Sequence, residues 1–366
     1  MPRYAELHCH TNYSFQDGAS WADDLMQRAS ELDYTALAIT DHNGFYGSVR
    51  FHQAAEAFGM PVVYGAEVGM PRLFPSTALA DSPSRLRERT GESVNPSEES
   101  SATQRETNNE KRETPRRGRT HPMHGSKPTD TLDLDHLMLL APSPRGYAAI
   151  SHFITQAQFR GRKDRPDYSY EDLTEAAGLG DLVALSGCHQ GAVGRAAAAC
   201  DLEGAMRHAS RLRDIFPGRF YLELWHHGMP EDDARNDLIW QVASRLGLPA
   251  VATNNVHYHD RAQADLAEVL AAIGGRRNLD AHDGFRPATD ERYLKSPDEM
   301  AQRLGRYRGS VERAADLAAS LAFDLRLVAP RLPDFGLPGA FTTEAEYLRH
   351  LVHEGAREVY PDGAGG

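Results

Sequence analysis

Short apolar runs alternate with helix-like segments along most of the chain. Seven runs have the length and aliphatic content of buried strands, at residues 5–10, 36–40, 61–68, 137–141, 182–186, 220–224 and 249–253. Helical patterns lie between them at residues 21–32, 47–58, 147–159, 202–216 and 231–246. Ser20, followed by Asp23, is expected to cap the first helix. The alternation predicts an α/β fold, either a parallel barrel or an open sheet, with its chemistry at the carboxyl ends of the strands.

Two regions break this pattern. Residues 75–130 are rich in Ser, Thr, Glu, Arg, Asn and Pro and contain few large apolar residues, so we expect a disordered insertion within the domain. After about residue 278 the chain changes to mixed helical segments and a proline-punctuated stretch, and it ends just after a helical pattern at 344–359. We therefore expect one domain over residues 1–278 and, over 279–366, a linker and the truncated beginning of a further region.

Composition limits the classes of protein that fit. The chain has 366 residues, of which 40% are hydrophobic and 25% charged, and no run of eighteen apolar residues or signal pattern is present. A cytoplasmic protein without a membrane partner is expected. Three scattered cysteines do not make a disulfide framework. The formal net charge of −12 argues against a broad basic surface for duplex DNA.

Histidines and carboxylates gather at the ends of the first three predicted strands. His8 and His10 lie two residues apart, so their imidazoles share one face of a strand and can reach one cation. The second strand runs into Asp41 and His42, and the third ends at Glu67. Because strand ends converge in such folds, these side chains are expected to meet.

Further candidate ligands follow elsewhere in the chain. Asp17, before the first helix, is either an oxygen donor or a turn residue. Cys188 follows the fifth strand, and Asn255 and His257 repeat the two-residue spacing after the seventh. His136 fits less well, because it precedes its apolar run instead of ending it.

Together these residues resemble the polymerase and histidinol phosphatase (PHP) domain of bacterial C-family DNA polymerases. The resemblance is carried by His8-x-His10, Asp17-Gly18-Ala19, Thr40-Asp41-His42, Gly65-Ala66-Glu67, His136-Leu137, Ser186-Gly187-Cys188 and Asn255-x-His257. The tail, from Ala322-Phe323-Asp324-Leu325 through Pro330-Arg331-Leu332-Pro333, resembles the error-prone branch of the DNA polymerase III alpha-subunit family, where it leads into the polymerase region.

The resemblance implies a distorted seven-stranded (β/α) barrel with up to three divalent metal ions, Zn²⁺ or Mn²⁺, with Mg²⁺ or Fe²⁺ as alternatives. By analogy with the family, one metal lies on His8, His10, Glu67 and Asn255, a second on Glu67, His136 and Cys188, and a third on Asp17, His42 and His257. The family reaction is hydrolysis of phosphoesters, including 3′-to-5′ exonuclease action, by hydroxide at the metal cluster. The implied partners are a DNA 3′ end and other subunits of a polymerase or lesion-bypass complex.

One departure leaves the activity open. Asn255 stands where metal-binding members usually carry Asp, and a neutral amide oxygen removes a negative charge from the first site. A catalytically inactive, partner-binding module is therefore the alternative to a hydrolase, and a free-standing histidinol-phosphatase-like enzyme is a further one.

Several other polar residues receive weaker interpretations. Arg160 and Arg162, in a short basic run, and His226, after the sixth strand, are candidates for binding substrate. The acidic pair at residues 133 and 135 is interpreted as a solvated turn. The catalytic carboxylates of a polymerase are not found in the sequence.

Overall fold

The structure, a computed structural model, describes residues 2–72, 134–162, 165–276, 278–279, 288–328 and 335–360. The insertion expected at residues 75–130 lies outside the described residues. The chain divides into two compact units, Met1–Leu325 and Arg326–Gly366.

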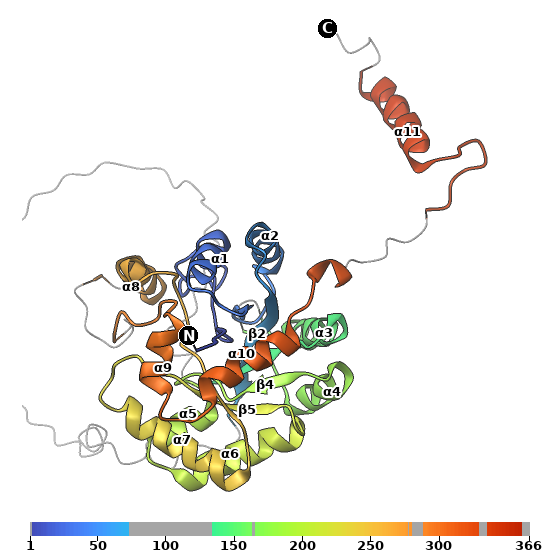
Figure 1. The fold of residues 1–366 in the computed structure, drawn as a ribbon. Coiled ribbons are helices and arrows are strands. Elements are labelled where there is room, and N and C mark those ends of the chain that lie inside the picture. The colour runs from blue at the N-terminus through green and yellow to red at the C-terminus, as the bar shows by residue number, and fades with distance from the viewer. Residues whose placement is uncertain are drawn as a thin grey trace, which may run out of the picture. The chain divides into compact units, whose positions relative to one another are not determined.

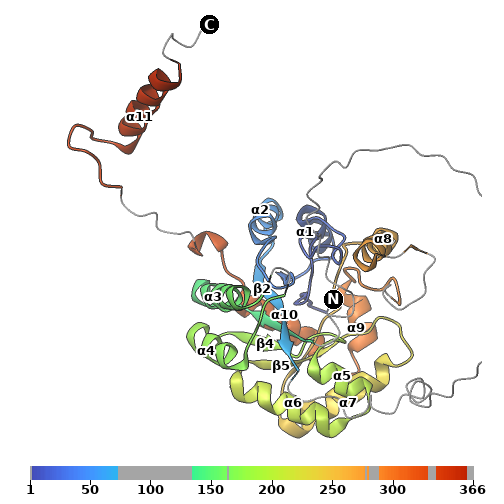
Figure 2. The same cartoon turned by 180° about the vertical axis from the view of Figure 1, so that it is seen from behind.

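The larger unit is built on one curled sheet of six strands (Figures 1 and 2). In sheet order these are β1 (Leu37–Ile39), β2 (Val62–Pro71), β3 (Leu134–Leu140), β4 (Val183–Leu185), β5 (Phe220–Leu224) and β6 (Ala250–Ala252). The predicted α/β class is confirmed. A wholly parallel sheet is wrong, because β3 pairs antiparallel with both β2 and β4. Antiparallel neighbours need no helical crossover, and the residues that join β2 to β3 lie outside the described part of the chain.

The first predicted strand, residues 5–10, is not one of the six. It forms single parallel bridges, Glu6 with Leu37 and Cys9 with Val256, instead of a continuous ladder. Val256 also donates its N–H to the carbonyl of His8 at 2.8 Å and accepts the N–H of His10 at 2.8 Å. This segment therefore lies between β1 and the chain that follows β6.

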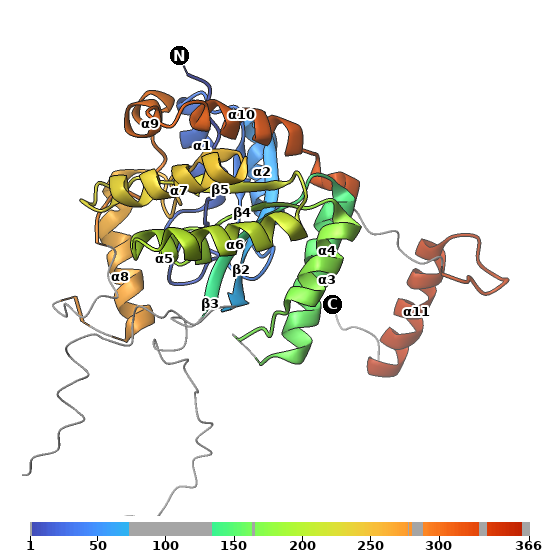
Figure 3. The ribbon, with the colours of Figure 1, turned by 90° about the horizontal axis from the view of Figure 1, so that it is seen from below.

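Helices cover the sheet, and Figure 3 shows α5 (Ala192–Ala198), α6 (Leu202–Ile215) and α7 (Asp232–Leu246) in front of the strands. All five predicted helices are confirmed within a few residues, as α1 (Ala22–Glu31), α2 (Ser48–Phe58), α3 (Pro144–Arg160), α6 and α7. The sequence patterns did not single out α4 (Tyr170–Gly180), α5 or α8 (Ala264–Gly275).

The cap predicted for α1 is wrong. Its N-cap is Trp21, which makes no side-chain capping bond. The hydroxyl of Ser20 instead lies 2.8 Å from Nδ1 of His259 and accepts the His259 N–H at 2.8 Å. A long-range partner therefore replaces the local cap.

The compact unit extends past residue 278. After α9 (Pro297–Leu304), α10 (Ser310–Leu321) packs against β6, where Arg313 donates to the carbonyl of Ala250. The N–H of Phe323 bonds to the carbonyl of Val62 at 3.3 Å. The second unit contains α11 (Glu344–Val359), capped by the Thr343 hydroxyl. No helix among the described residues is long and apolar enough to cross a membrane.

Candidate metal centre

Three predicted ligands meet in the interior of the larger unit. Nε2 of His8 lies 3.1 Å from Nε2 of His10 and 2.7 Å from Oε2 of Glu67, and the His10 nitrogen lies 3.2 Å from the same oxygen. All three side chains are buried. These separations approach the edge of a tetrahedron with bonds of about 2.0–2.1 Å, which is roughly 3.3 Å. The three donor atoms are therefore spaced as ligands of one small cation would be.

Neighbouring groups hold both imidazoles with Nε2 facing this point. Nδ1 of His8 lies 2.6 Å from Oε1 of Glu223, a carboxylate that must accept the ring N–H. Nδ1 of His10 lies 3.1 Å from Oγ of Ser14, whose own hydroxyl donates to Asp41 at 2.7 Å. With their Nδ1 atoms engaged by these groups, His8 and His10 turn their Nε2 atoms toward each other and toward Glu67. A bound carboxylate behind a ligating imidazole is common at metal sites.

Glu67 links this group to a second one. Its Oε1 contacts Nδ1 of His136 and lies 3.9 Å from Nδ1 of His42. The thiol of Cys188 lies 4.0 Å from the same oxygen and 3.7 Å from Nδ1 of His136. His136 reaches the site because β3 is antiparallel, so the beginning of this strand lies beside the later part of β2.

A third group lies on the more exposed side. Oδ2 of Asp17 is 2.7 Å from Nε2 of His42, and Oδ1 is 3.1 Å from Nδ1 of His257. Asn255 is buried with a φ of 45°, and its Oδ1 lies 3.1 Å from Nε2 of His257. The Asp17 side chain is 38% exposed and that of His42 29%, whereas His8 is fully buried, so solvent reaches the cluster from the Asp17 side.

Asp41 fixes the loop of residues 11–14, which lies between the ligands His10 and Asp17. Its carboxylate accepts the N–H of Thr11 at 2.8 Å, the Thr11 hydroxyl at 2.8 Å and the hydroxyl of Ser14. Burial raises the pKa of Asp41. The predicted convergence of Asp41 with the site residues is thus indirect, because its carboxylate is engaged by donors of the 11–14 loop.

Burial keeps several of the imidazoles neutral. It lowers the pKa of His10 and of His136 well below the ordinary value and that of His257 to about 3. Burial also raises the pKa of the Cys188 thiol to about 12. Desolvation would raise the pKa of Asp17, but its contacts with His257 and His42 outweigh that effect and leave the pKa well below its ordinary value. Neutral imidazoles keep their lone pairs for a metal, so the protonation states suit cation binding.

The residues fit divalent cations. Three groups have donor atoms within 4.8 Å of one another, namely His8, His10 and Glu67; His10, Asp17 and His42; and His42, Glu67 and His136. Mutually facing nitrogens next to a buried carboxylate are poorly explained by hydrogen bonds alone, and a shared cation would satisfy them. The mixture of imidazole, carboxylate and one thiol is typical of zinc and other transition metals more than of magnesium.

The remaining sequence-based candidates have other contacts. Arg160 pairs with Asp172, the backbone of Arg162 pairs with that of Arg165, and His226 lies 3.6 Å from Asp232. None of them is joined to the ligand groups by a contact within the described residues.

The interpretation of residue 135 as part of a solvated turn is wrong. Asp135 is buried in β3 and pairs with Arg195. Burial raises the pKa of Asp135 to about 6.

The contacts of two residues near the ligands were not predicted. Glu223 supports His8, and Arg292 lies 3.4 Å from Nε2 of His257. A carboxylate between two leucines of a buried strand was a usable signal for Glu223, because a buried charge requires a partner.

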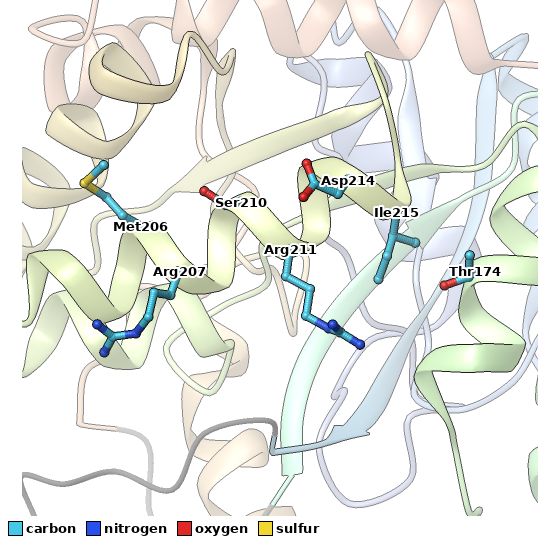
Figure 4. Close-up of a pocket in the computed structure, with 7 residues that line it drawn as sticks. All are labelled: Thr174, Met206, Arg207, Ser210, Arg211, Asp214 and Ile215. Atoms are coloured by element: carbon cyan, nitrogen blue, oxygen red, sulfur yellow. The ribbon is translucent and has the colours of Figure 1, made fainter.

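Surface hollows lie apart from these residues. One, of about 600 Å³, is lined by residues of α4 and α6, among them Arg207, Arg211 and Asp214. Figure 4 shows these side chains. Another, of about 470 Å³, is lined by residues of α3 and α4. Neither is lined by any residue of the three ligand groups.

Comparison with known sequences gives matches across the chain. Residues 6–227 match the family described as PHP domain. Error-prone DNA polymerases of Mycobacterium tuberculosis (strain H37Rv) and Cutibacterium acnes are 36% and 37% identical, each over 98% of this chain. The DNA polymerase III subunit alpha of Treponema pallidum is 27% identical over 98% of the chain. The chain spans 28%, 27% and 26% of these curated relatives, respectively.

Solved structures give weaker likenesses. One is a two-domain protein of Bacteroides vulgatus that contains a predicted PHP-like metal-dependent phosphoesterase, with a TM-score of 0.36 and 11% identity over 70% of this chain and 52% of that one. Another is an amidohydrolase of Chromobacterium violaceum, with a TM-score of 0.36 and 15% identity over 69% of this chain and 87% of that one.

Proposed function

Because the chain belongs to the PHP domain family, we propose that it is a metal-dependent phosphoesterase-type module of an error-prone DNA polymerase. The observation that carries the proposal is the convergence of His8, His10 and Glu67, whose donor atoms face one point. Family membership and the names of the relatives support the same assignment. In this proposal the substrate is a phosphoester, and a DNA 3′ end is the form that suits a replicative context.

The proposed ligands fall into three sets, two of which share Glu67. They are His8, His10, Glu67 and Asn255 for one cation; Glu67, His136 and Cys188 for a second; and Asp17, His42 and His257 for a third. Divalent cations bound there would polarise a phosphate and make water a nucleophile near neutral pH. Zn²⁺ or Mn²⁺ is proposed first, with Mg²⁺ or Fe²⁺ as alternatives.

The chain's own side chains have distinct parts in this scheme. Glu223 and Ser14 orient the two buried imidazoles, and the exposed Asp17–His42 side admits the substrate. Arg160, Arg162 and His226 remain proposed contacts to a longer substrate.

Several structural assignments are proposed with this function. They are a seventh strand over residues 5–10, supported by its bridges on both sides, and a PHP domain of residues 1–278 followed by the beginning of a polymerase region. A cytoplasmic location and association with other polymerase or lesion-bypass subunits belong to the same proposal.

A non-catalytic module is the second candidate, and Asn255 is the observation that favours it. A neutral amide in the proposed first ligand set provides less charge to hold a cation than a carboxylate would. Such a module would keep a metal for stability and bind other subunits without hydrolysing phosphoesters.

Metal analysis combined with hydrolysis assays tests the first candidate. The purified chain should contain divalent metal and should shorten a 3′-labelled oligonucleotide or cleave a small phosphate ester when Mn²⁺ or Zn²⁺ is present. His10→Ala should lose metal and activity, whereas His353→Ala, an exposed histidine of α11, should keep both. Metal bound without hydrolysis would favour the second candidate. A chain that binds no metal would overturn both.

A further inference from the structure

Arg292 is held beside the metal ligands by its backbone. Its carbonyl accepts the N–H of His257 at 2.9 Å and that of Tyr258 at 3.3 Å, and its own N–H lies 3.3 Å from the Tyr258 hydroxyl. The adjacent Tyr293 forms a parallel bridge with Tyr258. The chain at residue 292 is therefore fixed against the segment that carries His257 and Asn255.

The neighbours of Arg292 direct their side chains elsewhere. Glu291 pairs with Lys295 at 3.2 Å and with Arg303 at 2.8 Å, while the hydroxyl of Tyr293 bonds to Glu299. The Arg292 guanidinium instead reaches His257, at 3.4 Å from Nε2. Alternation along this extended segment thus sends one cationic side chain toward the ligand cluster.

The guanidinium keeps its hydrogen-bond donors available. No ion pair of the described residues joins Arg292 to a carboxylate, and the residue is partly exposed. Nε2 of His257 lies closer to Oδ1 of Asn255, at 3.1 Å. The Nδ1–H of His257 donates to Asp17, so Nε2 carries the lone pair and can accept at most one N–H of the guanidinium. The remaining N–H groups of the Arg292 guanidinium have no acceptor among the residues that the structure describes.

The charges around Arg292 indicate which kind of ligand its guanidinium suits. Asp17 and Glu67 bring negative charge to the cluster, whereas His10, His136 and His257 are neutral near pH 7. The positive charge of Arg292 is among the influences that lower the pKa of His10 and of His257. An arginine at the solvent-reached side of a candidate cation cluster is suited to an anion with oxygen donors on several faces, as a phosphate has.

We propose that Arg292 binds a non-bridging oxygen of the substrate phosphate at the Asp17–His42 side of the cluster. This inference rests on the proposed function and adds a substrate-binding residue to it. Arg292 lies beyond the family match, which ends at residue 227. It is a positioning group that orients a phosphoester and holds no metal.

Binding of inorganic phosphate tests this assignment without requiring turnover. Isothermal titration of the full chain, with its metal content measured, gives the dissociation constant for phosphate. Arg292→Ala should weaken phosphate binding by about ten- to a hundredfold, as expected for the loss of a charge-assisted hydrogen bond. Arg292→Lys should recover part of the affinity, because it restores the charge without the planar fork. Arg213→Ala, which removes an exposed arginine of α6 paired with Asp214, should change nothing.

The controls separate this proposal from the hydrolase proposal. Metal content and melting temperature should match the wild type in Arg292→Lys and Arg292→Gln, which both keep a polar side chain. Either variant can replace Arg292→Ala if that protein fails to fold. Unchanged phosphate affinity in the folded variants would overturn the role of Arg292, even in an active enzyme. Loss of metal along with phosphate would also overturn it. Phosphate binding that depends on Arg292 in a chain without hydrolysis would support it while refuting the hydrolase.

Discussion

Removing the carboxylate of Glu223 should weaken metal binding although Glu223 is not a proposed ligand. Oε1 accepts the Nδ1 proton of His8 at 2.6 Å and the Thr253 hydroxyl at 2.6 Å, and both partners are fully buried. Without that acceptor, the His8 ring is free to rotate or to move its proton to Nε2, which would block the lone pair directed at the cation. Loss of such a supporting partner typically lowers metal affinity about 10- to 100-fold.

The expected size can be worked out for two substitutions. A 10- to 100-fold loss of affinity corresponds to about 1.4–2.7 kcal/mol of binding free energy. Glu223→Ala also leaves two buried donors without an acceptor, at about 1–3 kcal/mol each, so the free energy of unfolding should fall by about 2–6 kcal/mol. Glu223→Gln keeps an oxygen acceptor and loses only the charge. Its affinity loss should therefore lie near the lower, tenfold end.

Chelator competition and urea unfolding measure these two effects separately. Metal affinity would be determined by competition with a chromophoric chelator, and unfolding would be followed on metal-free protein. Glu203→Gln is a matched control, because Glu203 is an exposed carboxylate on α6 that makes one loose ion pair at 3.9 Å. If folded Glu223→Ala binds metal as tightly as the wild type, the supporting role of Glu223 is refuted. If Glu223→Gln and Glu203→Gln change metal affinity equally, the effect assigned to the negative charge of Glu223 is refuted.

Two further predictions concern charge at and away from the cluster. Asn255→Asp should raise metal occupancy, measured by elemental analysis after dialysis, because it adds a negative charge to the proposed first ligand set; unchanged occupancy would show that Asn255 is not a ligand position. Burial, together with the charges of Arg195 and Arg207, lowers the pKa of His208 to about 4. As the pH falls, His208 is therefore protonated in the unfolded chain before it is protonated in the folded protein. The contribution of His208 to the free energy of unfolding is therefore fully present above about pH 6.5. Between that pH and pH 4 it falls by about 1.4 kcal/mol per pH unit. His208→Gln should accordingly lose less stability than the wild type over that interval in urea titrations, and parallel curves for the two proteins would contradict the assignment.

Patterns along the sequence predicted most of the helices and strands, because these elements depend largely on residues that are close together in the chain. The alternation of short apolar runs with helical periods gave the α/β class, and the spacing of His8 and His10 placed both on one side of a strand-like segment. The pairing of β2 with β3 was not available from such patterns. His136 therefore looked misplaced at the beginning of its run, although an antiparallel strand brings that beginning to Glu67.

The wrong or missing predictions for Ser20, Asp135 and Arg292 also arise from contacts between distant parts of the chain. Ser20 has the side chain of a helix cap, but His259, far along the chain, engages its hydroxyl. Asp135 lies next to an apolar run and was interpreted as solvated, yet β3 begins at Leu134 and buries it against Arg195. Arg292 carried no recognisable local signal, since its position depends on backbone bonds to the segment after β6. Long-range contacts decide these positions, and a single sequence does not record them.

The antiparallel pairing of β2 with β3 has a consequence for how this chain tolerates changes of length. Seven register pairs, from Gly65 with Leu140 to Pro71 with Leu134, align the two strands independently of the residues that connect them. The free energy of closing a connection grows only with the logarithm of its length, by about 0.6 kcal/mol for each doubling. Sequence could therefore be added or removed between residues 72 and 133 during evolution, or by fusing another protein there, while His136 and Glu67 keep their spacing.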